Sequence, residues 1–163
     1  MTSPPPLDDT AALRVWRDQT LYRLLLRASR AETTATLDRL HERGYDDVSI
    51  ADTNLLANLD TDGATITSLA RRAGVTRQAA SQQVAALERT GYVARRASPD
   101  DGRAVVVVQT PRGRALLREA LDIVEELELR YAADVGPKGL AALKRALRTF
   151  LDRVDPDGGL APD

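Results

Sequence analysis

The sequence predicts a mainly α-helical protein that contains one small β-hairpin. Apolar residues recur at helical spacing through the first and last thirds of the chain, and only residues 92–109 hold two short β-leaning runs around an aspartate-glycine turn. The length of 163 residues, with 43% hydrophobic and 29% charged, fits one soluble globular domain. We expect that domain to cover residues 10–154, between flexible tails at 1–9 and 155–163.

The N-terminal third is predicted to be helical. From Asp8 to about Gly44 the chain has no proline or glycine, and leucines recur at helical spacing, which predicts one long helix, with a bend allowed, over residues 10–44. Ser49 is then placed to cap a short helix, and the sequence DTDG at 60–63 is a turn that ends it.

The middle of the chain predicts two short helices joined by a tight turn. Thr65 and Thr76 are each placed to cap a helix, and Gly74 between them supplies the left-handed backbone that a tight turn needs. The second helix carries apolar residues at i, i+4 and i+7 and ends at Gly91. This order of elements is a helix-turn-helix.

A β-hairpin follows directly. Residues 92–97 and 103–109 form the predicted strands, SPDDG lies between them, and four successive valines favour a strand. A helix-turn-helix followed by such a hairpin is the winged-helix arrangement, here over about residues 49–110. Thr110 and Pro111 then open a helix to about Val135, Gly136-Pro137 breaks it, and a last helix is expected over about Lys138–Val154.

Positive charge is concentrated in the predicted winged helix. Residues 71–103 contain seven arginines and three acids, a net charge of +4, whereas the rest of the chain has 16 basic and 21 acidic residues. Arginines neutralise phosphates and release condensed counterions, so this distribution is typical of a nucleic-acid binder. A solvated arginine-rich surface would give the same count, and the position of the charge on a winged helix favours DNA.

The second helix of the pair is the expected DNA contact, because the major groove admits an α-helix whose N-terminal residues reach base edges. Arg77 suits guanine, and Gln78 or Gln82 suits adenine, whereas Thr76 and Ser81 suit phosphates. Capping alone also explains Thr76. On the wing, Arg95 and Arg96 are expected to meet backbone phosphates, and Arg103 is placed to reach a minor groove. The chemistry predicts double-stranded DNA as the partner.

Residues 66–117 resemble the MarR family of bacterial transcriptional regulators. The resemblance is specific in Asp101-Gly102-Arg103 on the wing and in Thr110-Pro111-Arg112-Gly113 at the start of the next helix. It implies that Arg103 enters the minor groove and that Asp101 orients it. Two positions depart from the family's pattern: Gln82 stands where many members carry a basic residue, and Gln109 stands where a leucine is usual.

The resemblance also implies a homodimer, with residues 10–44 and 111–154 as dimerisation helices. Such a dimer would bind a pseudo-palindromic site with half-sites about 10 bp, or a multiple, apart. Many members bind a small aromatic effector that weakens DNA binding, so a repressor relieved by a small molecule is implied. The candidate effector residues are the polar and aromatic side chains of the first helices, although core packing explains such residues as well. They are Trp16, Tyr22, His41 and Tyr45.

Other classes of function find little support. The chain has no cysteine and one histidine, which excludes thiolate sites and leaves little for a metal, so no metal or cofactor is expected. No phosphate-binding glycine loop, nucleophilic serine elbow or paired histidine indicates an enzyme. A protein-interaction module without specific DNA binding is the alternative. No signal peptide or membrane-spanning run is visible, so we expect a cytoplasmic protein.

Overall fold

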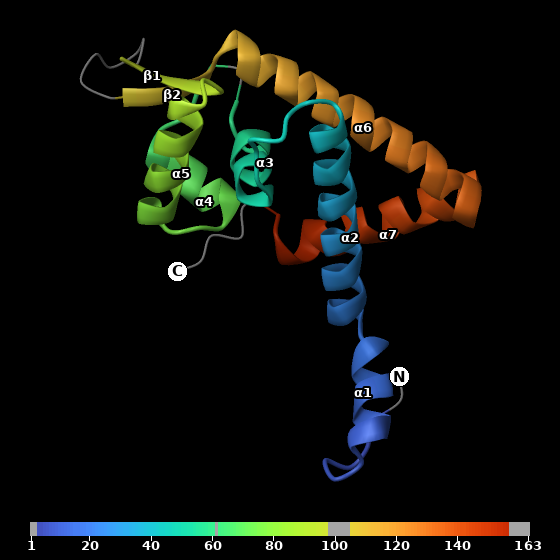
Figure 1. The fold of residues 1–163 in the computed structure, drawn as a ribbon. Helices are drawn as coiled ribbons and strands as arrows, with labels where there is room; N and C mark the ends of the chain where they lie inside the picture. The colour runs from blue at the N-terminus through green and yellow to red at the C-terminus, as the bar shows by residue number, and fades with distance from the viewer. Residues whose placement is uncertain (1–2, 61, 98–104, 157–163) are drawn as a thin grey trace.

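The computed structural model describes residues 3–60, 62–97 and 105–156, and places the winged-helix elements beside the helices from the two ends of the chain (Figure 1). The helices are α1 (Thr10–Asp18), α2 (Leu21–Glu42), α3 (Ile50–Ala57), α4 (Ile66–Ala73), α5 (Arg77–Arg89), α6 (Pro111–Val135) and α7 (Pro137–Val154), and the strands are β1 (Val93–Ala97) and β2 (Val105–Gln109). We call α3, α4, α5, β1 and β2 the winged-helix part, and α1, α2, α6 and α7 the flanking helices. The mainly helical class and the hairpin are confirmed.

The N-terminal helix predicted over residues 10–44 is two helices. α1 ends at Asp18, and Thr20 adopts an extended backbone, with φ −66° and ψ 146°. Its side-chain oxygen accepts a hydrogen bond from the backbone N–H of Arg23 at 3.3 Å, which caps α2. A threonine offers the backbone such a bond in place of continued helix, and this interrupts the chain without proline or glycine.

The short helices of the winged-helix part begin and end where the sequence predicts. Ser49 and Asp52 form a reciprocal capping box at the start of α3, and Thr65 and Thr76 cap α4 and α5. Gly74 ends α4 in the left-handed conformation, with φ 66°. The apolar faces of these helices meet in one buried core, which α2 and α6 complete. Its best-buried members include Leu40, Leu55, Leu69, Val84, Leu87, Tyr92, Val107, Leu116 and Ile123.

The hairpin packs on this core through one face. β1 and β2 pair antiparallel, with Arg95 opposite Val107 and Arg96 opposite Val106, and Ala64 forms a further bridge to Val107. Val107 is fully buried, whereas Val106 is only partly covered, because side chains alternate between the faces of a strand. The strands begin one residue later than predicted at Val93, and β2 is described from Val105.

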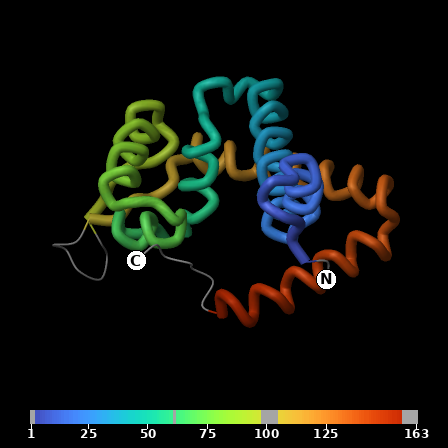
Figure 2. The backbone as a smooth tube through the Cα atoms, turned by 90° about the horizontal axis from the view of Figure 1, so that it is seen from below, coloured from blue at the N-terminus to red at the C-terminus, as the bar shows by residue number. Residues whose placement is uncertain are grey.

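The flanking helices are joined by polar clamps between α2 and α6. The Arg43 guanidinium contacts Glu119 at 2.7 Å and Glu126 at 2.6 Å, and the Tyr131 hydroxyl donates to Glu32 at 2.5 Å. Figure 2 shows α7 running back from the far end of α6 toward the winged-helix part. Neither α1 nor α7 has a buried residue. No helix in the described ranges is long and apolar enough to cross a membrane.

Candidate nucleic-acid interface

α5 presents a polar face away from the core, and we call it the recognition helix. Ala80, Val84 and Leu87 are buried on its inner side. The outer side carries most of the predicted contact residues. Arg77, Gln78 and Gln82 are exposed, Thr76 is exposed at the N-cap, and Ser81 is half-buried. The structure therefore brings all five predicted residues of this helix to its first two turns.

Thr76 is able to cap the helix and contact a phosphate at once. Its side-chain oxygen accepts from the backbone N–H of Ala79 at 3.1 Å, which leaves the hydroxyl proton available to donate. The phosphate would then also lie at the positive end of the helix dipole. The capping explanation and the binding explanation for this residue are compatible.

The two wing arginines that we predicted as phosphate contacts lie on opposite faces of the hairpin. Arg95 shares the face of Val107, and its guanidinium lies 3.4 Å from the Glu88 carboxylate at the end of α5. Arg96 is on the outer face, where it lines a cavity of about 500 Å³ together with Val106 and Arg114. Arg96 is exposed. The two side chains therefore leave the hairpin on opposite faces, and their phosphate contacts stay predictions.

Asp101 and Arg103 fall in the segment 98–104, outside the described residues, so their predicted wing roles stay predictions. Gln109, which departs from the family's pattern, is 7% exposed, and its amide nitrogen donates to the carbonyl of Leu59 at 3.3 Å. A buried polar side chain is tolerated when it is hydrogen-bonded, and here that bond ties β2 to the end of α3.

Two further arginines lie at the end of α4. Arg71 is exposed, whereas Arg72 is engaged by the carboxylate of Asp60 and lies 3.4 Å from the carbonyl of Asn58. The charge count identified both residues, but it did not show that Arg72 is paired whereas Arg71 has no ion pair or hydrogen bond among the described residues. Arg71 joins the candidate phosphate contacts, and Arg72 holds the loop after α3.

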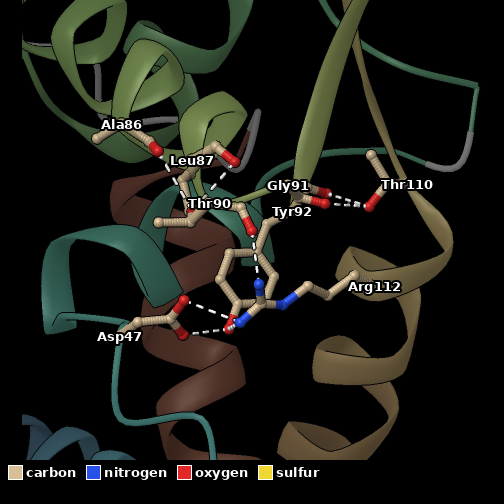
Figure 3. Close-up of polar contacts among 8 residues, drawn as sticks. All are labelled: Asp47, Ala86, Leu87, Thr90, Gly91, Tyr92, Thr110 and Arg112. Carbon is tan, nitrogen blue, oxygen red and sulfur yellow. Dashed lines mark hydrogen bonds and ion pairs between the residues drawn. The ribbon is translucent and has the colours of Figure 1, made fainter.

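A polar cluster that sequence reasoning missed lies where the recognition helix, the hairpin and α6 meet (Figure 3). The Arg112 guanidinium donates to the carbonyl of Thr90 at 2.8 Å, to the carboxylate of Asp47 at 2.8 Å and to the hydroxyl oxygen of Tyr92 at 3.1 Å. It also lies 4.4 Å from the centre of the Tyr92 ring. We call Asp47, Thr90, Tyr92 and Arg112 the Arg112 cluster.

Tyr92 is the buried member of this cluster. Its hydroxyl donates to Asp47, and its side chain has no exposed surface. Burial, followed by the hydrogen bond to Asp47, raises the pKa of Tyr92 to about 12. The tyrosine therefore stays protonated, and remains a donor, throughout the physiological pH range.

Backbone packing beside the cluster is equally close. The Thr110 hydroxyl donates to the carbonyl of Gly91 at 2.6 Å, and its oxygen accepts from the backbone N–H of Gly113 at 3.1 Å, which caps α6. A Cβ atom at Gly113 would lie 2.1 Å from the carbonyl oxygen of Tyr92. Only glycine permits this approach of α6 to the hairpin.

The predicted effector residues do not gather in one place. Trp16 lies on α1, which projects away from the winged-helix part, and Tyr22 is 71% exposed at the start of α2 (Figure 1). His41 and Tyr45 lie near the other end of α2, where a ring nitrogen of His41 is 2.9 Å from the carbonyl oxygen of Val48. Tyr45 packs against the core. Within the described ranges no cluster of side chains fits a metal ion.

Known proteins share this architecture. Residues 46–104 match the model of the MarR family. The HTH-type transcriptional repressor Rv2887 of Mycobacterium tuberculosis is 35% identical over 95 residues, which cover 58% of this chain and 66% of that repressor. The alignment thus spans slightly less than two thirds of the curated relative's length.

Solved structures extend the likeness. The repressor CouR bound to a 23-mer DNA duplex has a TM-score of 0.67 and 27% identity, covering 82% of this chain and 94% of CouR. Apo MarR of E. coli has a TM-score of 0.67 and 20% identity, covering 81% of this chain and 97% of MarR. The family model over residues 46–104, the repressor relatives and the shared fold therefore agree that the winged-helix part of this chain is similar to that of the MarR family.

Proposed function

We propose that the protein is a homodimeric, sequence-specific DNA-binding transcriptional regulator, and that it represses transcription until a small molecule releases it. The observation that carries the proposal is the polar outer face of the recognition helix, held on a winged helix in a region of net positive charge. The repressor relatives and the DNA-bound CouR structure support it. We propose no enzymatic activity for the chain, and we propose that it acts in the cytoplasm, because its proposed partner is DNA.

The flanking helices support the homodimer. Large apolar side chains are exposed on all four flanking helices, α1, α2, α6 and α7, where a second copy would cover them. They include Val15, Leu21, Tyr22, Leu24, Leu121, Leu129, Val135, Leu143, Phe150, Leu151 and Val154. A second copy would cover these surfaces and place two recognition helices on one side of a duplex.

The proposal includes a small aromatic effector. CouR of Rhodococcus jostii RHA1 has been solved with p-coumaroyl-CoA, with a TM-score of 0.69 and 21% identity over 85% of this chain and 94% of CouR. The four candidate residues lie at both ends of α2, so one small effector within a single chain would not contact all of them.

Selection of random duplex DNA on the purified protein tests the proposal, followed by binding of the enriched duplex at two salt concentrations. An inverted repeat bound by a dimer with a steep salt dependence is the expected result. Enrichment of no motif, with only weak binding at both salt concentrations, would contradict specific DNA binding and favour a winged helix that contacts proteins.

A further inference from the structure

We infer that Arg112 is a positioning residue that fixes the angle between the recognition helix and α6, and thereby sets which half-site spacing the dimer accepts. The inference rests on the proposed DNA-binding function and goes beyond it, because it assigns spacing specificity to a residue outside the expected DNA contacts. Its basis is the place of the Arg112 cluster between the winged-helix part and the flanking helices (Figure 3).

The chain crosses between these two parts at two places, and the cluster reaches both. Residues 43–49 connect α2 to α3, and Thr110 connects β2 to α6. Asp47 lies in the first connection, and Arg112 lies in the first turn of α6, directly after the second. The ion pair at 2.8 Å therefore ties the two connections to each other.

The same guanidinium holds the end of the recognition helix. Thr90 is the C-cap residue of α5, and its carbonyl accepts from Arg112 at 2.8 Å. A guanidinium is planar and presents its donors in fixed directions, so three acceptors held at once define an orientation. Apolar burial in the core between the parts has no preferred direction of its own, whereas the hydrogen bonds of the guanidinium do.

The flanking helices would pass this orientation on to the dimer. Arg43 bridges α2 to Glu119 and Glu126 of α6, and Lys144 of α7 contacts Glu128 of α6 at 2.5 Å. These ion pairs hold α2, α6 and α7 together, and the winged-helix part packs against this group of helices. A change of angle at the start of α6 then moves the two recognition helices of a dimer relative to each other.

Half-site spacing is sensitive to such a change. Adding one base pair moves a half-site by about 3.4 Å along the duplex and rotates it by about 35°. A dimer with a fixed angle accepts one half-site spacing. A dimer that pivots at this junction also binds duplexes with neighbouring spacings, but it loses affinity for the duplex with the best spacing.

The test measures dissociation constants for a panel of duplexes whose half-sites are moved apart or together in steps of one base pair, and for a duplex with a single half-site. Arg112→Met removes the clamp, and Arg112→Lys keeps the charge but cannot reach three acceptors in fixed directions. Arg118→Met is the matched control, because Arg118 is an exposed arginine of the same helix without an ion pair or hydrogen bond among the described residues.

We expect the wild type and Arg118→Met to lose about tenfold in affinity per base-pair step from the best spacing. Both Arg112 variants should keep the single half-site affinity within about twofold and reduce the penalty per step to about twofold. Tyr92→Phe removes one hydroxyl of the cluster with little change in packing, and should reduce the penalty per step to an intermediate value. This variant tests the inference if the Arg112 variants fold poorly.

A second readout needs no DNA. The chain has no cysteine, so Gln82→Cys places one spin label on each exposed recognition helix of the dimer. The distance distribution between the labels should broaden when Arg112→Met is added and stay unchanged with Arg118→Met.

An unchanged spacing profile and an unchanged distance distribution in folded Arg112 variants would overturn the inference. Equal weakening on every duplex, the single half-site included, with a smaller salt dependence for Arg112→Met than for Arg112→Lys, would also overturn it, because that pattern indicates a direct phosphate contact. If the wild type binds no duplex selectively while the distances broaden, the proposed function fails and the clamp alone stands.

Discussion

At the scale of the residue, we expect the recognition helix to carry both contacts that specify sequence and contacts that position the protein on DNA. Arg77 is exposed in the first turn of α5, where a guanidinium reaches the base edges of the major groove. We expect Arg77→Ala to cost about 1–3 kcal/mol of binding free energy on the selected site and to relax the preference at one base position. Dissociation constants for single-base variants of the site measure this. A uniform loss on all duplexes would instead make Arg77 a phosphate contact.

Tyr92 predicts how stability depends on pH. Its pKa is raised to about 12 in the folded protein, against about 10 in the unfolded chain, so the unfolded state binds fewer protons between these values. The contribution of Tyr92 to the free energy of unfolding is therefore complete below pH 10. It falls by about 2–3 kcal/mol as the pH rises toward 12. Urea unfolding at pH 9, 10 and 11 should show the fall in the wild type and a smaller one in Tyr92→Phe. An equal fall of the unfolding free energy with pH in both proteins would contradict this prediction.

The arginines also show what sequence can and cannot predict at this scale. That Arg95 and Arg96 face opposite ways follows from the period of two along a strand, so this feature was predictable from the sequence. The role of Arg112 was not predictable locally, because Asp47 lies 65 positions away along the chain. Long-range polar partners leave no periodic pattern, whereas caps and apolar faces do.

At the scale of the element, the start of α6 depends on a glycine that no side chain can replace. Gly113→Ala would place Cβ 2.1 Å from the carbonyl oxygen of Tyr92. Either the backbone at Tyr92 or the start of α6 must move, and we expect this to lower the free energy of unfolding by about 1–3 kcal/mol or more. Thermal or urea unfolding measures the loss.

Gly139 in α7 provides the matched control. A Cβ there would meet only the Val135 side chain, at 3.7 Å, an ordinary contact. Because alanine favours a helix over glycine, Gly139→Ala should stabilise the protein by about 0.5–1 kcal/mol. Similar effects of the two substitutions would show that helix propensity, and not the approach to Tyr92, governs Gly113.

Most elements were predictable because their ends carry local chemistry. Thr65, Gly74, Thr76 and Thr110 mark helix ends in the sequence and mark them in the structure. The break between α1 and α2 was missed because Thr20 caps α2 from inside a run that reads as continuous helix. A threonine at such a place is compatible with a helix interior and with a cap, and tertiary packing decides between them.

At the scale of the whole molecule, the proposed dimer predicts that DNA binding and association fail together. Leu143 is 54% exposed on α7, among other apolar residues of that helix. We expect Leu143→Glu to shift the dimer toward monomer and to weaken binding to the full site by at least about tenfold, because a buried charge in an apolar interface is unpaired. Sedimentation and binding to full and single half-sites measure both effects. A dimer that persists in the variant would exclude this face of α7 as the interface.

The absence of any buried residue in α7 has a consequence for how the protein endures in a cell. Within the chain α7 contacts α6 but buries no residue completely, so we expect the proposed second copy to add to the free energy that holds this 18-residue helix in place. Newly made chains at low abundance would spend time with this helix frayed and open to proteases. The protein would then accumulate only when its concentration is high enough for chains to pair, since unpaired chains are degraded while paired ones persist.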